Sequence, residues 1–158
     1  MGTELGDNII KALKDKTQLF KDLAIKLGKT EAELAQYTVL REVPLSTTGG
    51  FMKADVVLVK KSADGLSIDD VIIIENKLSK TTDFTIRQKE GFNAIGKGTD
   101  INPTKMTIER PLSDGSLKVA DGPLEVKPSK CFRISDHGKS SEAINLNIET
   151  IDYSKIKL

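Results

Sequence analysis

Two residues at the end of one apolar segment have the types and the spacing for phosphate chemistry. Glu75 and Lys77 close the segment Val71–Lys77, in which the four positions before Glu75 are Val or Ile. Successive side chains of a strand point to opposite faces, so a carboxylate and an ammonium two residues apart share one face. Burying a lone charge is costly. These groups therefore need a partner or a metal.

Asp55 raises the same question on a second apolar segment, Lys53–Lys60. It stands directly before a run of four aliphatic residues that begins at Val56. A hairpin that joins the two segments through the turn-rich stretch 62–65 would bring Asp55 opposite the Glu75 region. We therefore expect two carboxylates and one lysine to converge.

The chemistry available to this set is metal-dependent phosphodiester hydrolysis. Two carboxylates and a backbone carbonyl, here that of Asn76, suit a hard divalent cation, and we expect Mg²⁺, with Mn²⁺ or Zn²⁺ as alternatives. Such a cation polarises a phosphate and lowers the pKa of a bound water, while Lys77 orients that water or neutralises developing charge. The plainer alternative is an ordinary solvated strand end.

Hydrophobic periodicity predicts the elements that position these residues. Helical spacing over 5–27 stops at Gly28, and a later helix is expected from about Phe84 to Ile95, with Thr81 or Thr82 as its cap. Unbroken apolar runs at 56–59 and 71–74 are typical of strands covered on both faces. Strands are predicted over the ranges Thr38–Leu45, Lys53–Lys60, Val71–Lys77, Thr107–Leu112, Leu117–Ala120, Cys131–Ile134 and Ile144–Ile151.

The segment 54–59, the turn-rich interval, the segment 71–77 and a following helix together resemble the PD-(D/E)XK nuclease superfamily, over roughly residues 38–96. The conserved core of that family is a helix, three strands, a helix and a further strand. The resemblance implies an α/β (α+β) fold: a restriction-endonuclease-like mixed central sheet flanked by helices, with an N-terminal helical segment. It also implies that Asp55 and Glu75 bind the metal and that Lys77 is the catalytic lysine. Ala54 stands where the motif has proline.

Further acids and amides are candidates for the same site. Gln88 is placed on the helix that follows Glu75 and is expected to face the site, as in several branches of the superfamily, or to solvate a helix flank. Glu42, on the preceding strand, is the first choice for an additional acid. Glu4 is a weaker one. Glu33 is already explained as the capping-box partner of Thr30.

Basic residues near the second predicted helix are candidates for nucleic-acid binding. Lys80, Arg87 and Lys89 could hold phosphates of a substrate, although charged side chains at a helix start are usually only solvated. His137, the sole histidine, lies in a turn-like stretch and is expected to be exposed rather than catalytic.

A second resemblance concerns biology. The segment Thr85–Gly91 has the spacing T-x-x-Q-x-x-G and is similar to C-terminal toxin domains of bacterial polymorphic and contact-dependent growth inhibition systems. Those domains cleave DNA or tRNA in a rival cell and are blocked by an immunity protein. The resemblance implies action in a bacterial cytoplasm after delivery within a larger secreted protein, with a cognate immunity protein as partner. A housekeeping or phage nuclease would carry the same catalytic residues.

A non-catalytic alternative is a helix-turn-helix DNA-binding module in residues 23–35. Its candidate second helix is short and acidic, which suits the major groove poorly. Metal-dependent cleavage separates the two alternatives.

The totals limit the function classes. The 158 residues fit one nuclease domain, which we divide into a helical N-terminal region (residues 1–37), a catalytic core (residues 38–96) and a β-rich C-terminal region (residues 97–158).

The net charge of +1 means that any affinity for nucleic acid must come from a local patch. Cys131 is the only cysteine, which excludes an internal disulfide. Aromatic residues at 4% disfavour recognition of single strands by stacking. No membrane segment is expected, because no apolar run approaches about 20 residues.

Overall fold

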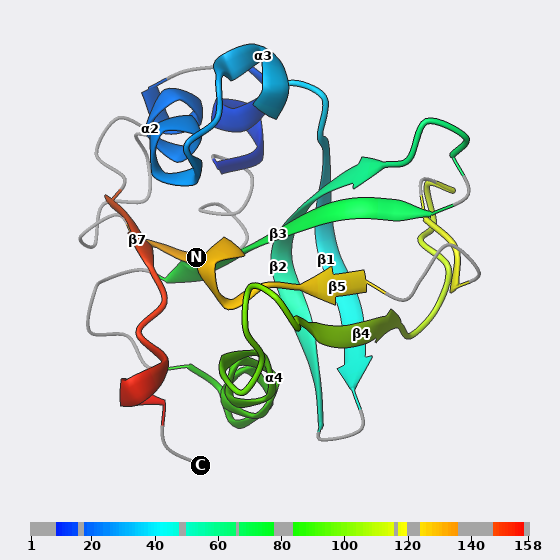
Figure 1. The fold of residues 1–158 in the computed structure, drawn as a ribbon, viewed down its shortest axis with the longest axis vertical. Helices are drawn as coiled ribbons and strands as arrows, with labels where there is room; N and C mark the ends of the chain where they lie inside the picture. Colours follow the sequence, from blue (N-terminus) through cyan, green and yellow to red (C-terminus); the bar gives the residue numbers. More distant parts are fainter. Residues whose placement is uncertain are drawn as a thin grey trace.

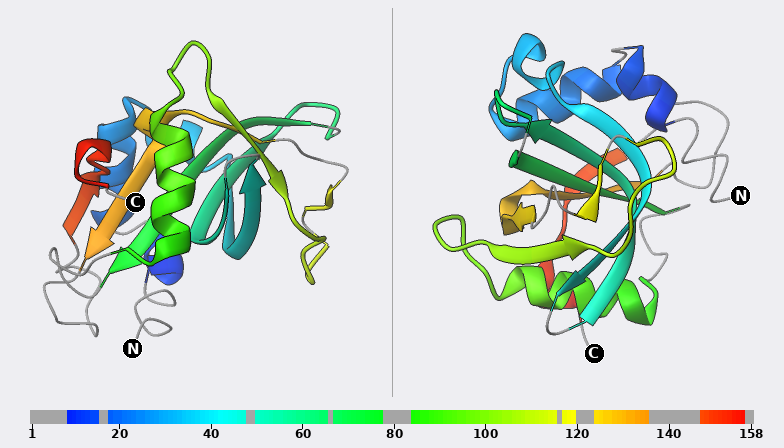
Figure 2. Two further views of the ribbon diagram at one scale, coloured as in Figure 1. Left: turned by 90° about the horizontal axis from the view of Figure 1, so that it is seen from below. Right: turned by 90° about the vertical axis from the view of Figure 1, so that its right-hand side faces the viewer.

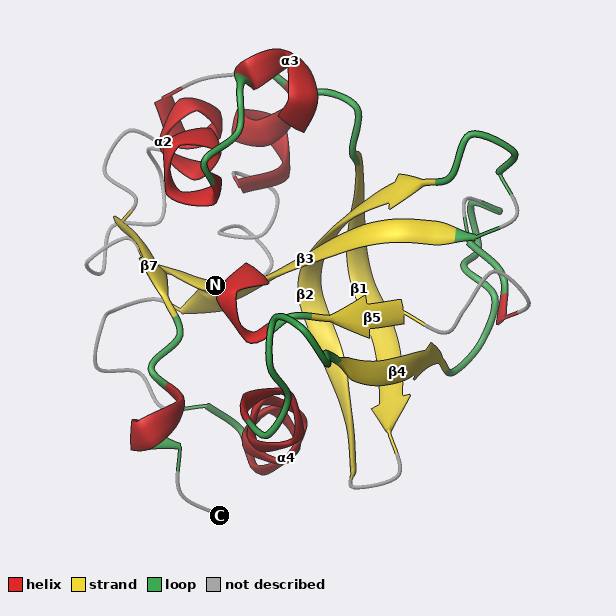
Figure 3. Cartoon of the chain, viewed as in Figure 1, coloured by secondary structure: helices red, strands yellow, loops and turns green. Residues whose placement is uncertain are grey.

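A computed structural model describes residues 9–15, 18–47, 50–65, 67–77, 84–115, 117–119, 124–135 and 147–156. Within these ranges seven strands form one mixed, curled sheet in the order β5-β4-β1-β2-β3-β6-β7, with helices on both sides (Figures 1 and 3). The strands are β1 Thr38–Thr47, β2 Gly50–Lys61, β3 Ile68–Lys77, β4 Thr104–Ile108, β5 Leu124–Val126, β6 Cys131–Ser135 and β7 Asn147–Thr150. The helices include α2 Gln18–Leu27, α3 Glu31–Leu34 and α4 Ile86–Gly96, with short 3₁₀ turns at Pro128–Lys130 and Tyr153–Lys155. The predicted fold class, a mixed sheet flanked by helices, is confirmed.

The middle of the sheet is an antiparallel meander of β1, β2 and β3. Val57 lies opposite Leu40 on one side and Ile73 on the other, so the two apolar runs are direct neighbours. All eight residues at 56–59 and 71–74 are at most 1% exposed. The prediction that these strands are covered on both faces is therefore confirmed.

The connection after β3 crosses over the sheet. β6 pairs with β3 in parallel, with Glu75 opposite Arg133, and a parallel neighbour requires a crossover connection. α4 belongs to that crossover and stands beside the ends of β3 and β6 (Figure 2, left). The side chain of Thr85 caps the helix by accepting a hydrogen bond from Gln88 N. The ends of two central strands and the start of a helix are thereby brought together.

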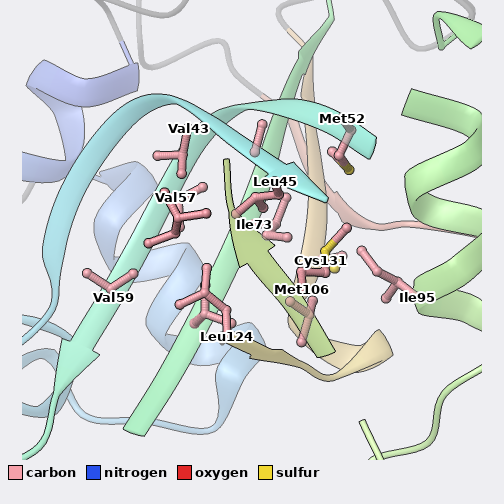
Figure 4. Close-up of a cluster of buried hydrophobic side chains, with 14 of the residues drawn as sticks. Val43, Leu45, Met52, Val57, Val59, Ile73, Ile95, Met106, Leu124 and Cys131 are labelled. Carbon is pink, nitrogen blue, oxygen red and sulfur yellow. The ribbon is translucent and has the colours of Figure 1, made fainter. Parts of the chain in front are cut away.

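Two hydrophobic cores hold the layers. The first core fills the curl of the sheet and includes Val57, Ile73, Ile95 and Met106 (Figure 4). β4 and β5 close this core, because the sheet curls until β5 contacts β3 (Figure 2, right). The second core lies between the opposite face of the sheet and the N-terminal helices, where Phe20 and Leu23 pack with neighbours from β2 and β3.

A glycine allows α4 to approach the sheet closely. A Cβ placed on Gly91 would lie 2.4 Å from Met52 Sδ and 3.0 Å from Met52 Cβ. Met52 is fully buried and has little room to move. A side chain at residue 91 would therefore displace the first half of α4, which carries Gln88.

Local signals in the N-terminal region are confirmed. Residues 9–14 are helical, and α2 ends before Gly28, whose φ of 66° is the left-handed conformation common at helix ends. Thr30 and Glu33 form the predicted capping box at α3. None of the described helices is long and apolar enough to cross a membrane.

Three predicted elements are wrong in detail. The strand before the turn at 113–115 is β4 at Thr104–Ile108, rather than Thr107–Leu112. It pairs with β5 rather than with Leu117–Ala120. Of the described residues there, Leu117 is buried and both Lys118 and Val119 are exposed, so the alternation of a strand is missing. The helix cap is Thr85, whereas Thr81 and Thr82 lie outside the described residues.

Tyr37, Asp70 and Lys130 form a polar cluster near the start of β3, at the other end of that strand from Glu75. Asp70, at the start of β3, accepts hydrogen bonds from the Tyr37 hydroxyl and from Lys130 Nζ, the latter at 2.6 Å. Burial raises the pKa of Asp70, but the hydrogen bonds from Lys130 and Tyr37 outweigh it, so the pKa lies below its usual value. The ionised carboxylate therefore stabilises the fold.

We predict that Asp70→Asn lowers the free energy of unfolding near pH 7 by about 1–2 kcal/mol. A carboxyl with a lowered folded-state pKa contributes stability above its unfolded pKa of about 3.9 and loses it as the pH falls further. The gap between wild type and variant should therefore narrow as the pH falls below about 3.9 and close once the pH is below the lowered folded-state pKa, as measured by urea unfolding. Asp69→Asn, an exposed neighbour on β3, is the control. A gap that stays constant with pH would contradict the assignment.

Candidate functional site

The register of β2 and β3 brings the two predicted metal-binding acids together. Val56 lies opposite Ile74, and continuing the same register places Asp55 opposite Glu75. Asp55 Oδ2 accepts a hydrogen bond of 2.8 Å from the backbone N of Asn76. This bond uses one of the two carboxylate oxygens of Asp55 and fixes its side chain beside the end of β3.

Glu75 is a fully buried carboxylate held by Gln88. Its side chain is 0% exposed, and Gln88 Nε2 donates to Glu75 Oε2 over 2.7 Å. Gln88 Oε1 in turn accepts from the backbone N of Thr85 over 2.9 Å. Both ends of the amide are therefore engaged, and its orientation is fixed by the helix cap. Of the two alternatives for Gln88, the structure has the one in which its side chain reaches Glu75, and its catalytic role stays a prediction.

The start of α4 also favours a negative charge at this point. Gln88 is the third residue of the helix, and unpaired backbone N–H groups give a helix start a partial positive charge. Glu75 reaches that helix end through its hydrogen bond with Gln88. A capped helix thus offsets some of the cost of burying this carboxylate.

Arg133 belongs to the site and was missed by the sequence analysis. It lies on β6 directly beside Glu75 in the parallel register, and its guanidinium carbon is 5.3 Å from the centroid of the Phe84 ring. The Phe84 ring packs on that of Phe92, with centroids 5.1 Å apart. A half-buried arginine held over an aromatic face is well suited to bind a phosphate. The signal for it was an arginine inside the otherwise apolar segment 131–134.

The backbone of β1 is irregular at Glu42. Arg41 lies opposite Val56 and Val43 opposite Ala54, which leaves Glu42 opposite Asp55. Glu42 has a φ of 54°, a conformation that costs a side-chain-bearing residue about 1 kcal/mol or more. Its side chain is 59% exposed and its Oε2 is 3.9 Å from Lys53 Nζ. Glu42 is thus near Asp55 but pairs at the surface, and its role as an additional acid stays a prediction.

The remaining candidates are distributed as follows. Lys77 pairs through its backbone with Ser135 on β6, and its side chain lies outside the described residues, as do Lys80, Glu4 and His137. Arg87 is exposed in the first turn of α4, and Lys89 is half-buried. The Glu33 side chain accepts a hydrogen bond from the backbone N of Thr30 in the capping box of α3. Cys131 is fully buried, and burial raises the pKa of its thiol to about 12, so it stays protonated.

The donor set fits a hard divalent cation. Carboxylate oxygens of Asp55 and Glu75, with the backbone carbonyl of Asn76, are the ligand types that Mg²⁺ prefers. Among the described residues no three acidic, histidine or cysteine side chains group as metal ligands. The predicted ligand set has two such side chains, Asp55 and Glu75, together with a backbone carbonyl, so it does not require a group of three.

No family model, curated protein or solved structure matches the chain.

We predict that Gln88→Leu lowers the free energy of unfolding by about 2–4 kcal/mol, because a buried carboxylate loses the Gln88 donor and the backbone N of Thr85 loses its acceptor in the capping box. Thr85→Ala removes only the capping side chain and should cost about 1 kcal/mol. Urea unfolding measures both. Adding Glu75→Gln to Gln88→Leu should recover some of the loss, because the buried group is then neutral. Equal losses in Gln88→Leu and Thr85→Ala would show that Glu75 does not need Gln88.

Proposed function

We propose that the protein is a metal-dependent nuclease that hydrolyses phosphodiester bonds. The observation that carries the proposal is the fully buried Glu75 carboxylate, positioned by Gln88 at the end of a central strand with Asp55 opposite in register. Burying an ionised carboxylate is unfavourable unless the group has a partner or a metal. Two carboxylates that converge at the end of a central strand form a ligand set for a hard divalent cation, which supports a chemical purpose for this position.

Each residue of the site has a role in the proposed reaction. Asp55 and Glu75 hold a divalent cation, and Gln88 orients Glu75 for it. When bound, the cation supplies Lewis acidity to the scissile phosphate and to water. Lys77 orients the attacking water or neutralises the charge that develops on the phosphate, and Arg133 stabilises the same charge from β6. Phe84 restricts Arg133 and so lowers the entropy lost when it binds phosphate.

The order of elements supports the PD-(D/E)XK resemblance. Helices α2 and α3 precede the meander of β1, β2 and β3; α4 follows, and β6 then pairs with β3. This is the expected sequence of helix, three strands, helix and strand. The excursion that forms β4 and β5 lies between α4 and β6 and encloses the first core.

The substrate in this proposal is duplex DNA or structured tRNA. The chain has no tryptophan, and aromatic residues make up 4% of it, which suits recognition of a backbone better than stacking on bases. The helix-turn-helix alternative is weak, because α3 has four residues and its Leu34 is buried in the second core. A single turn presents too few side chains for reading a major groove.

We predict that the purified protein cleaves plasmid DNA or total tRNA with Mg²⁺, Mn²⁺ or Zn²⁺ and is inactive after chelation. Glu75→Gln and Asp55→Asn should each lower the cleavage rate by about 100-fold or more, because each removes a charged ligand. Lys77→Ala should abolish cleavage while much of the metal binding, measured by calorimetry, is kept.

Asp69→Asn is the matched control, since Asp69 is an exposed acid on the same strand as Glu75. Unchanged cleavage in folded Glu75→Gln, or equal losses in Asp69→Asn, would refute the proposed site.

We further propose that the nuclease is a bacterial toxin domain with a cognate immunity protein. What supports this is the T-x-x-Q-x-x-G spacing of Thr85–Gly91, which resembles such toxin domains and whose Thr and Gln form the cap beside Glu75. Production of the wild type in bacteria should arrest growth, and Glu75→Gln should be harmless yet still bind the inhibitor. Growth arrest by the cleavage-dead variant would show that the harm has another cause.

A further inference from the structure

A groove beside the candidate site is lined by three cationic side chains, those of Lys53, Arg87 and Arg110. It has a volume of about 520 Å³ and is lined by Pro44, Met52, Lys53, Arg87, Glu109 and Arg110. Three cations and one carboxylate give this basic groove a net charge of +2, whereas the whole chain has +1. The remainder of the chain therefore has a net charge of −1, so the groove is more positive than the chain as a whole.

The basic groove adjoins the proposed cleavage site through two elements. Lys53 precedes Asp55 by two residues on β2, so their Cα atoms are about 7 Å apart, close to two nucleotide rises along one strand of DNA. Arg87 immediately precedes Gln88, which holds Glu75. The first turn of α4 thus presents Gln88 to Glu75 and Arg87 to the groove.

The floor of the groove is fixed, and the ion pair of Lys53 at its edge is weak. Met52 is fully buried beneath α4, and the backbone N of Glu109 donates to the carbonyl of Pro44 over 3.0 Å, which ties the segment after β4 to β1. The pair between Lys53 and Glu42 is 3.9 Å long, and both side chains are more than half exposed. Such a pair is weak and can give way to a phosphate.

We propose that the basic groove binds the sugar-phosphate backbone of the substrate next to the cleaved bond, with Lys53, Arg87 and Arg110 as phosphate contacts. The inference rests on the proposed nuclease function. No aromatic side chain is among the groove residues, so the contacts are to the backbone and add affinity without sequence preference.

The test measures binding of labelled duplex DNA and of tRNA by fluorescence anisotropy over a salt series, in a chelator so that nothing is cleaved. The variant is Lys53→Gln, Arg87→Gln and Arg110→Gln together. Its control is Lys11→Gln, Lys21→Gln and Lys26→Gln, which removes the same charge from exposed residues of the N-terminal helices. The groove variant should weaken binding tenfold or more and reduce the slope of log K against log salt by about 2.7 for duplex DNA, or about 0.9 per contact.

Lys53→Gln alone changes one exposed position and should reduce the slope of log K against log salt by about 0.9. This single variant provides the test if the triple variant does not fold. Equal losses in the groove and control variants, or wild type that binds neither nucleic acid, would overturn the inference. Because binding is measured without metal, the two proposals fail separately. If the wild type does not cleave but the groove variant loses binding, only the proposed nuclease function is refuted. If the wild type cleaves and the groove variant binds normally, only the proposed role of the groove is refuted.

Discussion

The hydrogen bond from Gln88 to the buried carboxylate of Glu75 is the interaction on which the site depends. It joins the end of β3 to the start of α4, two elements that follow each other along the chain. A carboxylate in an apolar layer requires a nearby donor or a cation. The capping box supplies the donor, since Thr85 and Gln88 fix each other before Gln88 reaches Glu75. The same residues that begin the helix therefore define the position of the proposed metal ligand.

The surrounding fold keeps that bond in place. Gly91 lets α4 lie against Met52, and Phe92 and Ile95 anchor the helix in the first core. β6 pairs with β3 in parallel and brings Arg133 beside Glu75, so a positive and a negative side chain share one edge of the site. On the other side of the first turn of α4, Arg87 lines the basic groove. One helix start thus connects the carboxylates to the proposed path of the substrate.

Much of this arrangement could be predicted from sequence because its signals are local. The apolar runs at 56–59 and 71–74 identify buried neighbouring strands, and Asp55 and Glu75 stand out as charges at their ends. The Thr85-to-Gln88 spacing is a capping-box signal, which would have placed the helix start correctly in preference to Thr81 or Thr82. Arg133 could not be placed, because its position beside Glu75 comes from a parallel pairing between distant segments. β5 is three residues long between prolines at 123 and 128 and shows no usable periodicity.

Asp55 and Glu75 are proposed to share one divalent cation at the end of β3. The most direct measurement is anomalous diffraction from crystals of the protein grown with Mn²⁺. We expect a single anomalous peak within about 2.2 Å of a carboxylate oxygen of each residue, a length typical of small divalent cations. An ion held by other residues, or no ion between Asp55 and Glu75 at a Mn²⁺ concentration that supports cleavage, would contradict the account.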